Sequence, residues 1–338
     1  MIYRNFPLKR YNSFGLDYKA DKFIIIKSVE EFVELVGQKK APGFPYFILG
    51  GGSNVLFTSD YNGAIIHPEI EGIEVEKNDG ESVLVSVGAG IEWDRLVEWS
   101  VDKGLYGLEN LSHIPGSVGA APVQNIGAYG KEAGEVIDRV VAVNISDGLI
   151  RTFTNEECGF DYRDSVFKRE LKNRYLIVKV FFRLSVNGGF NLNYGSLERE
   201  VDRLGGATLK NVRQAVINIR NSKLPNPGIL GSAGSFFKNP VVDSGKAELL
   251  KNRFPEMPVY SDKSGLAKLS AGWLIERCGW KGKRHGDAGV HEKQALVIVN
   301  YGKATGRQIV ELSEDIKRSV LEMFGIELES EVEIVGSI

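Results

Sequence analysis

The sequence contains the run Tyr46-Phe47-Ile48-Leu49-Gly50-Gly51-Gly52-Ser53-Asn54, in which apolar residues pass directly into three glycines, a serine and an asparagine. The apolar part predicts a buried strand. Small residues at the end of a strand leave backbone N–H groups uncovered, and such groups form a nest for an anion such as phosphate. The run is not a P-loop, because no Gly-Lys-Ser/Thr follows. A plain flexible turn is the alternative, and the run alone does not decide between the two.

A second glycine-rich stretch extends from Ile114 to Gly130 and shows neither a helical nor a strand period. Loops of this length inside compact domains are usually functional or disordered. The isoleucines, valines and tyrosine within the stretch argue against disorder. Its length favours a large planar ligand with a phosphate tail over a simple anion, and a buried structural loop is the alternative.

The strand predicted at 83–87 ends in Gly88-Ala89-Gly90, which suggests a dinucleotide-binding turn. The third glycine of that fingerprint is missing, since Trp93 stands in its place. No second strand with an acidic end follows about 20 residues later. We therefore interpret this region as a strand–turn–helix connection, and the helix is expected to bury Leu96, Val97 and Val101.

The remaining periodicity predicts a mixed α and β protein. Further strands are expected at 23–26, 140–143, 176–184 and 295–299. Helices are expected after a capping box of Ser28 and Glu31, and at 208–220, 271–278 and 305–324. A closing strand at 326–334 would place four glutamates on one face. The segment around Pro225 and Pro227 is the best domain boundary.

Two short polar stretches admit a bland and a functional interpretation. Gly231 to Pro240 reads as a turn leading into a strand with two core phenylalanines, or as a closed site in which Ser235 carries a proton. Tyr162-Arg163-Asp164-Ser165 reads as a surface turn in which Arg163 pairs with Asp164. The residues alone leave these alternatives open.

Composition excludes several classes of protein. The chain has 338 residues, which favours two or three domains, and its formal charge of −2 argues against nucleic acid as a partner. No apolar run is long enough to span a membrane, and the residues after Met1 form no secretory signal. The four histidines have no metal-ligand spacing, so no metal site is expected. Two distant cysteines fit a reducing cytoplasm.

Taken together and in order, five of these stretches resemble one bacterial enzyme family. They are Gly50 to Leu56, the loop 115–130, Tyr162 to Ser165, Gly234 to Pro240 and Leu328 to Val332. The chain is similar from end to end to the UDP-N-acetylenolpyruvoylglucosamine reductases (UDP-N-acetylmuramate dehydrogenases, MurB). It resembles the longer of two forms in that family, because Asn193-Tyr194-Gly195 lies on an insert that the shorter form lacks.

The resemblance implies an α+β fold with an FAD-binding domain of the vanillyl-alcohol-oxidase (PCMH) type. Two α+β subdomains, at 1–69 and 70–224, would bind FAD, and a smaller α+β domain at 225–329 would bind substrate. The segment 330–338 would return to the first subdomain. This flavin fold uses no dinucleotide fingerprint, which agrees with the missing glycine.

The resemblance also implies the reaction and its residues. NADPH would reduce FAD, and FADH2 would pass a hydride to the methylene carbon of the enolpyruvyl ether of UDP-N-acetylglucosamine, giving UDP-N-acetylmuramate for peptidoglycan synthesis. Ser235 would protonate the adjacent carbon, Arg163 would stabilise the developing negative charge, and Glu331 would polarise the substrate carboxylate. The implied FAD-binding residues are Gly50, Gly51, Gly52, Ser53, Asn54, Val55, Leu56, Pro115, Gly116, Ser117, Gly119, Ala120, Val123, Asn125, Gly127, Ile177 and Arg220. The implied substrate-binding residues are Tyr194, Lys223, Asn239, Lys281 and Gln294.

The chain departs from the family at one position, where Glu333 stands in place of an arginine that many relatives carry. A cytoplasmic monomer that binds neither nucleic acid nor membrane is expected. Two other functions remain open: an oxidase or dehydrogenase of the same flavin fold acting on a small hydroxy acid or alcohol, and a non-catalytic nucleotide-sugar binder. An alcohol oxidase needs a base where this chain offers a proton donor. A binder would be colourless.

Overall fold

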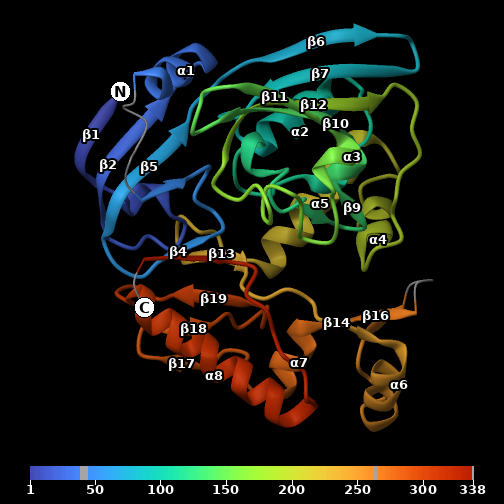
Figure 1. Cartoon of the computed structure of the whole chain (residues 1–338). Helices are drawn as coiled ribbons and strands as arrows, with labels where there is room; N and C mark the ends of the chain where they lie inside the picture. Colours follow the sequence, from blue (N-terminus) through green and yellow to red (C-terminus); the bar gives the residue numbers. More distant parts are fainter. Residues whose placement is uncertain (39–44, 262–264, 337–338) are drawn as a thin grey trace. The chain divides into compact units, whose positions relative to one another are not determined.

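The computed structural model describes residues 1–38, 45–261 and 265–336 (Figure 1). The chain divides into two compact units. The first contains Met1–Phe6, Lys19–Gly52 and Asn62–Ser222, and the second contains Pro7–Tyr18, Ser53–Tyr61 and Lys223–Ile338. The finer division into three domains stays a prediction, and the last two residues of the segment 330–338 lie outside the described part.

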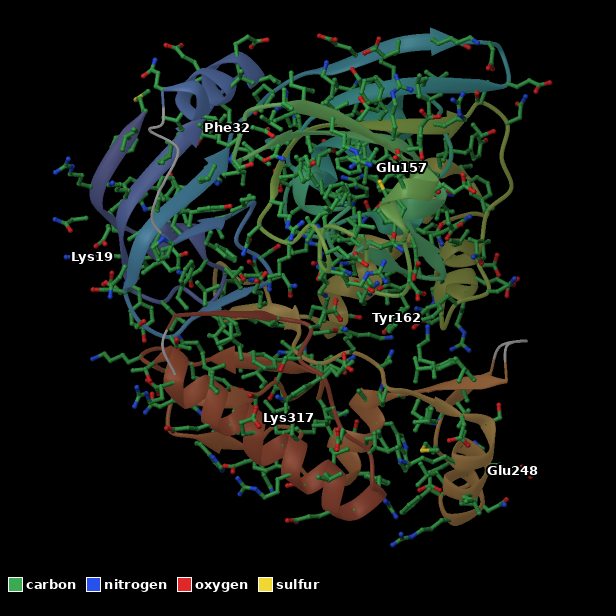
Figure 2. The ribbon with its side chains drawn as sticks, in the orientation of Figure 1. Lys19, Phe32, Glu157, Tyr162, Glu248 and Lys317 are labelled. Atoms are coloured by element: carbon green, nitrogen blue, oxygen red, sulfur yellow. The ribbon has the colours of Figure 1, made fainter. Side chains whose placement is uncertain are left out.

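The first unit begins with a four-stranded sheet in the order β1-β2-β5-β3. Its strands are β1 (Ile2–Pro7), β2 (Lys19–Ile26), β3 (Tyr46–Ile48) and β5 (Tyr61–Pro68). Helix α1 (Val29–Gly37) buries Phe32, labelled in Figure 2, in the core of this sheet. The Ser28 hydroxyl caps α1 as predicted, but the Glu31 carboxylate accepts from the amide of Lys27 instead of closing the capping box on Ser28.

A five-stranded antiparallel sheet forms the rest of the first unit, in the order β11-β10-β12-β7-β6. Its strands are β6 (Ile73–Asn78), β7 (Ser82–Gly88), β10 (Ile137–Asn144), β11 (Ile150–Thr154) and β12 (Tyr175–Ser185). One face packs on α2 (Trp93–Asp102), which buries Leu96, Val97 and Val101 as predicted. The predicted strands at 83–87, 140–143 and 176–184 are confirmed.

Short elements complete the first unit. The 3-10 turns η2 (Glu109–Leu111), η3 (Val118–Ala120) and η4 (Ala133–Glu135) lie along the long loop region, with the small hairpin of β8 (Gly127–Ala128) and β9 (Lys131–Glu132). The helices are α3 (Asn155–Cys158), α4 (Leu197–Arg203) and α5 (Leu209–Lys223). Helices α4 and α5 share a separate apolar cluster, which accounts for the helical period predicted at 208–220.

The second unit has a four-stranded sheet in the order β13-β19-β18-β17, on which the long helix α8 packs (Figure 1). The strands are β13 (Gly231–Ser235), β17 (Arg284–His285), β18 (Ala288–Val290) and β19 (Val297–Asn300). Helix α8 (Gly306–Phe324) starts at a capping box of Thr305 and Gln308 and ends at Gly325, whose φ is +62°. Its apolar face gives the unit its core.

The remaining elements of the second unit are smaller. A three-stranded sheet has the order β14-β16-β15, from β14 (Val241–Asp243), β15 (Val259–Ser261) and β16 (Leu266–Leu269), with α6 (Ser244–Arg253) beside it. Helix α7 (Ala271–Arg277) confirms the helix predicted at 271–278. The 3-10 turn η1 (Lys9–Tyr11) lies in the N-terminal segment of this unit.

The closing strand is shorter than predicted. Regular pairing is confined to β20 (Glu333–Val335), which runs parallel to β4 (Val55–Phe57). The residues before it keep the predicted alternation of burial, with Ile326, Leu328 and Val332 buried, without a continuous strand partner. Alternation in the sequence therefore predicted the direction of the side chains and overestimated the length of the strand.

Candidate active site

The two glycine-rich loops of the first unit pack against each other. A Cβ atom added to Gly50 would lie 2.7 Å from the Ser117 hydroxyl oxygen, and one added to Gly51 would lie 2.7 Å from the Cα of Gly116. No side chain fits between backbones at that separation. Gly51 is therefore required by this close approach of backbones, whereas the atoms nearest to a Cβ on Gly50 belong to side chains.

This contact gathers backbone donors that the protein itself does not use. The N–H groups of Gly50, Gly51, Gly52, Gly116 and Ser117 donate no hydrogen bond to any residue in the described part of the chain. The buried Ser117 hydroxyl also has no partner there. Gly52 and Ser117 are buried, whereas Gly51 is exposed and Gly50 and Gly116 are partly buried, so an anion can reach the group from solvent. A buried hydroxyl without a partner is costly, and several free N–H groups beside it fit a bound phosphate or pyrophosphate. The predicted anion nest is thus consistent with the structure.

Arg220, near the end of α5, adds a positive charge to the same unit. Its Nε donates to the carbonyl oxygen of His113 at 3.0 Å, and its guanidinium forms no ion pair with any described residue. Dense surrounding protein lowers the pKa of Arg220 below its usual value, although the Tyr129 hydroxyl and the Asp94 carboxylate act in the opposite direction. A crowded guanidinium without a carboxylate fits an anionic ligand.

A partly buried ion pair contacts the residue before the second glycine-rich loop. Arg213 of α5 donates to both carboxylate oxygens of Asp94 on α2, at 2.6 and 2.9 Å. The same carboxylate accepts from the backbone N–H of His113 at 2.5 Å. Asp94 therefore fixes the residue that precedes Ile114, where the loop begins.

The Asn125 side chain is used within the protein, and its predicted contact with the cofactor stays a prediction. Its side-chain amide donates to the Glu132 carboxylate and to the carbonyl oxygen of Asp161, and its Oδ1 accepts from the N–H of Gly134. The side chain is 2% exposed. All of its atoms that form hydrogen bonds are thus engaged within the unit, so any contact between Asn125 and a cofactor would use its backbone.

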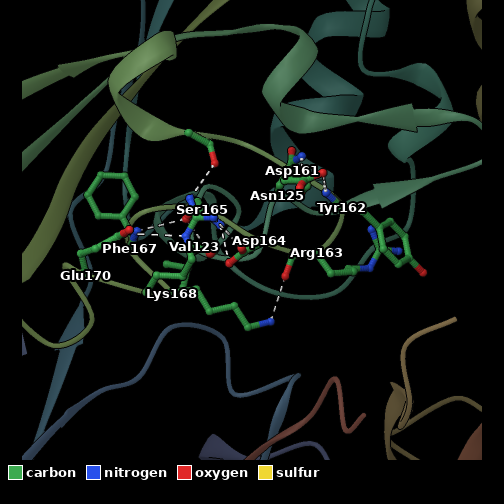
Figure 3. Close-up of polar contacts among 12 residues, drawn as sticks. Val123, Asn125, Asp161, Tyr162, Arg163, Asp164, Ser165, Phe167, Lys168 and Glu170 are labelled. Carbon is green, nitrogen blue, oxygen red and sulfur yellow. Dashed lines mark hydrogen bonds and ion pairs between the residues drawn. The ribbon is translucent and has the colours of Figure 1, made fainter. Parts of the chain in front are cut away.

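Arg163 lies in the turn that Asn125 and Ser165 hold (Figure 3). Its Nη2 donates to the carbonyl oxygen of Gly127 at 2.7 Å, and its own carbonyl oxygen accepts from the Lys168 ammonium at 3.0 Å. A Cβ on Gly127 would lie 3.0 Å from Nη1 of Arg163. Because Gly127 has no side chain, the guanidinium can lie flat against the loop.

The sequence also admitted a surface turn in which Arg163 pairs with Asp164. The structure shows another partner for Asp164. The Asp164 carboxylate forms an ion pair with Arg169 at 3.0 Å. The Ser165 hydroxyl donates to the carbonyl oxygen of Val123, so the turn is tied to the glycine-rich loop (Figure 3).

Backbone strain concentrates in the same network. Six residues other than glycine have a positive φ in the described part of the chain, and four of them belong to this network: His113, Asn125, Tyr129 and Arg163. Such conformations cost free energy for residues with a Cβ, and they gather at functional sites. Backbone strain is thus concentrated in and beside the second glycine-rich loop and in the turn of Arg163.

In the second unit, Ser235 ends β13 at an irregularity. The register of β13 on β19 shifts between Ser232 and Ser235, and the intervening Gly234 has a φ of +69°. A bulge of this kind redirects the side chain that follows it. The Ser235 hydroxyl is half-buried and makes no hydrogen bond with a described residue.

The small residues before Ser235 have a structural cause that the sequence did not reveal. A Cβ on Gly231 would collide with the carbonyl oxygen of Phe14, and the N–H of Ser232 donates to the carbonyl oxygen of Ser13. Phe236 and Phe237 are both core residues. The two phenylalanines are thus core residues as predicted, but the strand is β13 (Gly231–Ser235), which ends before them and occupies the expected turn. The functional interpretation of Ser235 stays a prediction.

Glu331 lies beside Ser235 through the backbone. The N–H of Glu331 donates to the carbonyl oxygen of Phe236 at 2.8 Å, and the Asn54 side chain donates to the carbonyl oxygen of Glu331 at 3.1 Å. Asn54 is also an acceptor, because the backbone N–H of Glu333 donates to its carbonyl oxygen. Lys238, the obvious charged candidate in this stretch, pairs with Glu329 at 2.9 Å.

The five predicted substrate-binding residues occupy different environments. Tyr194 is 46% exposed and packs edge-to-face on Tyr129. Asn239 accepts from the N–H of Ala271 at the start of α7, and the Gln294 side chain accepts from the N–H of Leu296. Two lysines are exposed: Lys223 at the end of α5, and Lys281, which pairs with Glu276.

Several predicted cofactor residues would contribute only through their backbone or their lack of bulk. Val55, Leu56 and Ile177 are buried, with exposures of 7%, 0% and 5%. Gly119 packs on Ala89, where a Cβ would lie 2.6 Å from the alanine Cβ. The prediction also included Ser53, Pro115 and Ala120, which lie in the two loops. It missed Asp94 and Arg213, because nothing in the sequence links residues 119 positions apart.

Comparison with known proteins agrees with the fold and the loops. Residues 226–335 match the family described as UDP-N-acetylenolpyruvoylglucosamine reductase, C-terminal domain, and residues 20–154 match the FAD binding domain family. The chain is 46% identical over 336 residues to the UDP-N-acetylenolpyruvoylglucosamine reductase of Amoebophilus asiaticus, covering 99% of each chain. It is 45% identical to that of Pseudomonas aeruginosa, covering 96% of each.

A solved structure is similar over the whole chain. The crystal structure of the reductase (MurB) from Thermus caldophilus matches with a TM-score of 0.69 and 26% identity, covering 99% of this chain and 98% of the other. The predicted α+β fold with an FAD-binding domain is therefore confirmed. The chain belongs to the UDP-N-acetylenolpyruvoylglucosamine reductase family, the FAD-binding oxidoreductases that act in peptidoglycan synthesis.

Proposed function

We propose that the chain reduces the enolpyruvyl ether of UDP-N-acetylglucosamine to UDP-N-acetylmuramate, with NADPH as the electron donor. A hydride and a proton add across the carbon–carbon double bond, and one NADPH is oxidised for each product. The observation that carries this proposal is the backbone pairing of Glu331 with Phe236, which places a carboxylate and the Ser235 hydroxyl on adjoining segments.

The proposed cofactor site is the group of loop N–H and hydroxyl donors that have no hydrogen-bond partner among the described residues. The loop amides of Gly50, Gly51 and Gly116, together with the Ser117 hydroxyl, would bind the pyrophosphate of FAD, and Arg220 would balance its charge. FAD held there would provide the hydride-transfer chemistry, with NADPH as the source of the electrons. The apolar side chains of Val55, Leu56 and Ile177 would line the cofactor site, and Asn125 would contact the cofactor through its backbone, since its side chain is already hydrogen-bonded.

Three residues of the chain would carry the remaining chemistry. Negative charge builds up beside the substrate carboxylate during hydride addition, and the fixed guanidinium of Arg163 lowers the energy of that charge. Ser235 donates a proton to the carbon next to the carboxylate, since a strongly basic carbon accepts even from a weak acid. Glu331 polarises the carboxylate, and we propose that it shares a proton there because two bare carboxylates repel.

We assign substrate binding to Tyr194, Lys223, Asn239, Lys281 and Gln294.

We also propose that the enzyme is a monomer in the cytoplasm. Both cysteines, Cys158 and Cys278, are unpaired, which supports a reducing compartment. No helix among the described residues is long and apolar enough to cross a membrane.

An anaerobic absorbance experiment tests the proposed function. The purified protein should be yellow, NADPH should bleach its flavin, and the UDP-sugar enolpyruvyl ether should restore the oxidised spectrum with one equivalent of UDP-N-acetylmuramate formed. A small hydroxy acid added to the oxidised protein in place of NADPH serves as the control, and it should leave the flavin oxidised. Reduced flavin that ignores the ether would refute the proposal.

A further inference from the structure

Asn110, on η2 in the first unit, joins two segments that carry tyrosines. Its side-chain amide donates to the carbonyl oxygen of Tyr129 at 2.9 Å and to the carbonyl oxygen of Asn191 at 2.8 Å. The residue is 1% exposed. One buried side chain thus connects the end of the glycine-rich loop with the segment between β12 and α4.

The contact is reciprocal. The Asn191 side chain donates to the carbonyl oxygen of Gly130 at 3.0 Å, so the segment at 191 also binds the end of the glycine-rich loop directly. Phe190 packs on Tyr106 beside this point, with ring centroids 5.5 Å apart. The two segments are therefore held together by two asparagines, while Phe190 attaches the second segment to the residues before η2.

Tyr129 occupies a position that its residue type does not favour. It forms, with Gly130, the two-residue turn between β8 and β9, and both residues have a positive φ, at +49° and +75°. Positive values at both positions define a type I′ turn, in which asparagine, aspartate or glycine is preferred. A tyrosine at the first position costs free energy, which the hydrogen bond from Asn110 to its carbonyl oxygen offsets.

The strained turn and the neighbouring segment present two rings to each other. Tyr129 and Tyr194 pack edge-to-face with centroids 5.9 Å apart. Burial raises the pKa of the Tyr129 hydroxyl, so this side chain is a neutral hydrogen-bonding group. The backbone carbonyl of Tyr129 and the segment leading to Tyr194 are the two groups that Asn110 holds.

We propose that Asn110 is a positioning residue for substrate binding, which fixes the Tyr129–Tyr194 pair by holding the backbone of both segments. The inference rests on the proposed function, in which Tyr194 contacts the UDP-sugar. It extends that function by giving Tyr129 a share in the same subsite and by naming the group that keeps both rings in place.

The test compares Asn110→Ala with Asn155→Ala. Asn155 is a matched control, because its amide also bridges two carbonyl oxygens, those of Gly134 and Ile137, without touching the tyrosine segments. Both variants should keep their FAD and lose a few degrees of Tm. Only Asn110→Ala should raise the KM for the UDP-sugar, by about tenfold, or ~1.4 kcal/mol, with kcat within about twofold.

Further variants keep the proposal open to refutation. Tyr129→Asn should relieve the strain in the turn and raise Tm, and it should still raise KM because the ring is lost. If Asn110→Ala fails to fold or loses FAD, Asn191→Ala decides, since it breaks the second link from an exposed position. The inference would be overturned if Asn110→Ala, or Asn191→Ala in its place, folds and keeps the wild-type KM. It would also be overturned if the change in KM equals that of Asn155→Ala.

The proposed function is tested separately by the wild type. If the wild type does not reduce the enolpyruvyl ether, the proposed function fails whatever the variants do. If it does and the asparagine variants keep the wild-type KM, only the role of Asn110 is refuted.

Discussion

The backbone N–H of Glu331 donates a 2.8 Å hydrogen bond to the carbonyl oxygen of Phe236, the residue that follows Ser235. Lys238 and Glu329 continue the pairing, since the N–H of Lys238 donates to the carbonyl oxygen of Glu329. Two segments almost a hundred residues apart are thereby locked in antiparallel contact. This pairing gives the second unit a serine hydroxyl and a carboxylate on neighbouring backbones, and neither depends on a flexible loop.

Ser235→Ala should separate the two halves of the reaction. The hydroxyl makes no hydrogen bond with the described residues, so its removal should leave folding and FAD binding unchanged. NADPH should still bleach the flavin at the wild-type rate, while reoxidation by the enolpyruvyl ether should slow by at least about a hundredfold. Stopped-flow absorbance measures both steps. Ser235→Cys, which retains an acidic proton, is the control and should recover part of the second step.

Gly127→Ala should displace the guanidinium of Arg163. The new Cβ would lie 2.9 Å from the carbonyl oxygen of Lys131 and 3.0 Å from Nη1 of Arg163. Since the backbone cannot move as easily as a side chain, the guanidinium shifts, and kcat should fall by about tenfold while FAD is retained. Gly37→Ala is the control, because a Cβ there meets nothing within 4 Å. Equal kcat values for the two variants would contradict the assignment.

The sequence predicted the secondary structure of the site better than its contacts. The strand before Gly50, the helix beginning near Trp93 and the loop from Ile114 follow from local periodicity and glycine content, which one sequence displays. The closing strand was overestimated, because alternation of apolar residues shows which side chains are buried but not whether a partner strand is present. Regular pairing in fact requires β4, whose residues are distant in the sequence.

Side-chain partners are the part that a single sequence could not give. The family resemblance implied that Asn125 binds the cofactor, yet its side-chain amide is used by Glu132 and Asp161. Gly231 belongs to a stretch that was read either as a turn or as a closed site, and the structure shows that the carbonyl of Phe14 lies against it. In both cases the residue type showed that a close polar or steric contact exists, and only the fold determines which group makes it.

Gly51→Ala should weaken FAD binding. Its Cβ would lie 2.7 Å from the Cα of Gly116 and 3.3 Å from the N–H nitrogen of Ser117, and both are backbone atoms. Such overpacking costs about 1–3 kcal/mol. The loops would separate and the unused donors would no longer converge. The flavin-to-protein absorbance ratio after dialysis should fall clearly below that of Gly37→Ala, and full retention of FAD would argue against a nest built from both loops.

Asp94→Asn should lower stability in a pH-dependent way. Burial opposes the charged form of Asp94, but the hydrogen bonds from Arg213 and His113 prevail and hold the pKa of its carboxyl below the usual value. A carboxyl whose folded pKa is depressed stabilises the fold above its unfolded pKa of about 3.9, and this contribution is lost as pH falls through the folded pKa. The variant should therefore lose about 2 kcal/mol at pH 7.

Urea unfolding at neutral and acidic pH checks this expectation, because the difference between the wild type and Asp94→Asn should shrink below about pH 4. Glu98→Gln is the matched control, since Glu98 approaches the same Arg213 at 3.7 Å but is exposed to solvent. Exposed pairs contribute little, so its effect should stay below about 1 kcal/mol. Because Asp94 also holds the N–H of His113, its loss should loosen the entrance of the loop from Ile114 and lower FAD occupancy as well. A destabilisation that is the same at both pH values would show that Asp94 acts through packing and not through its charge.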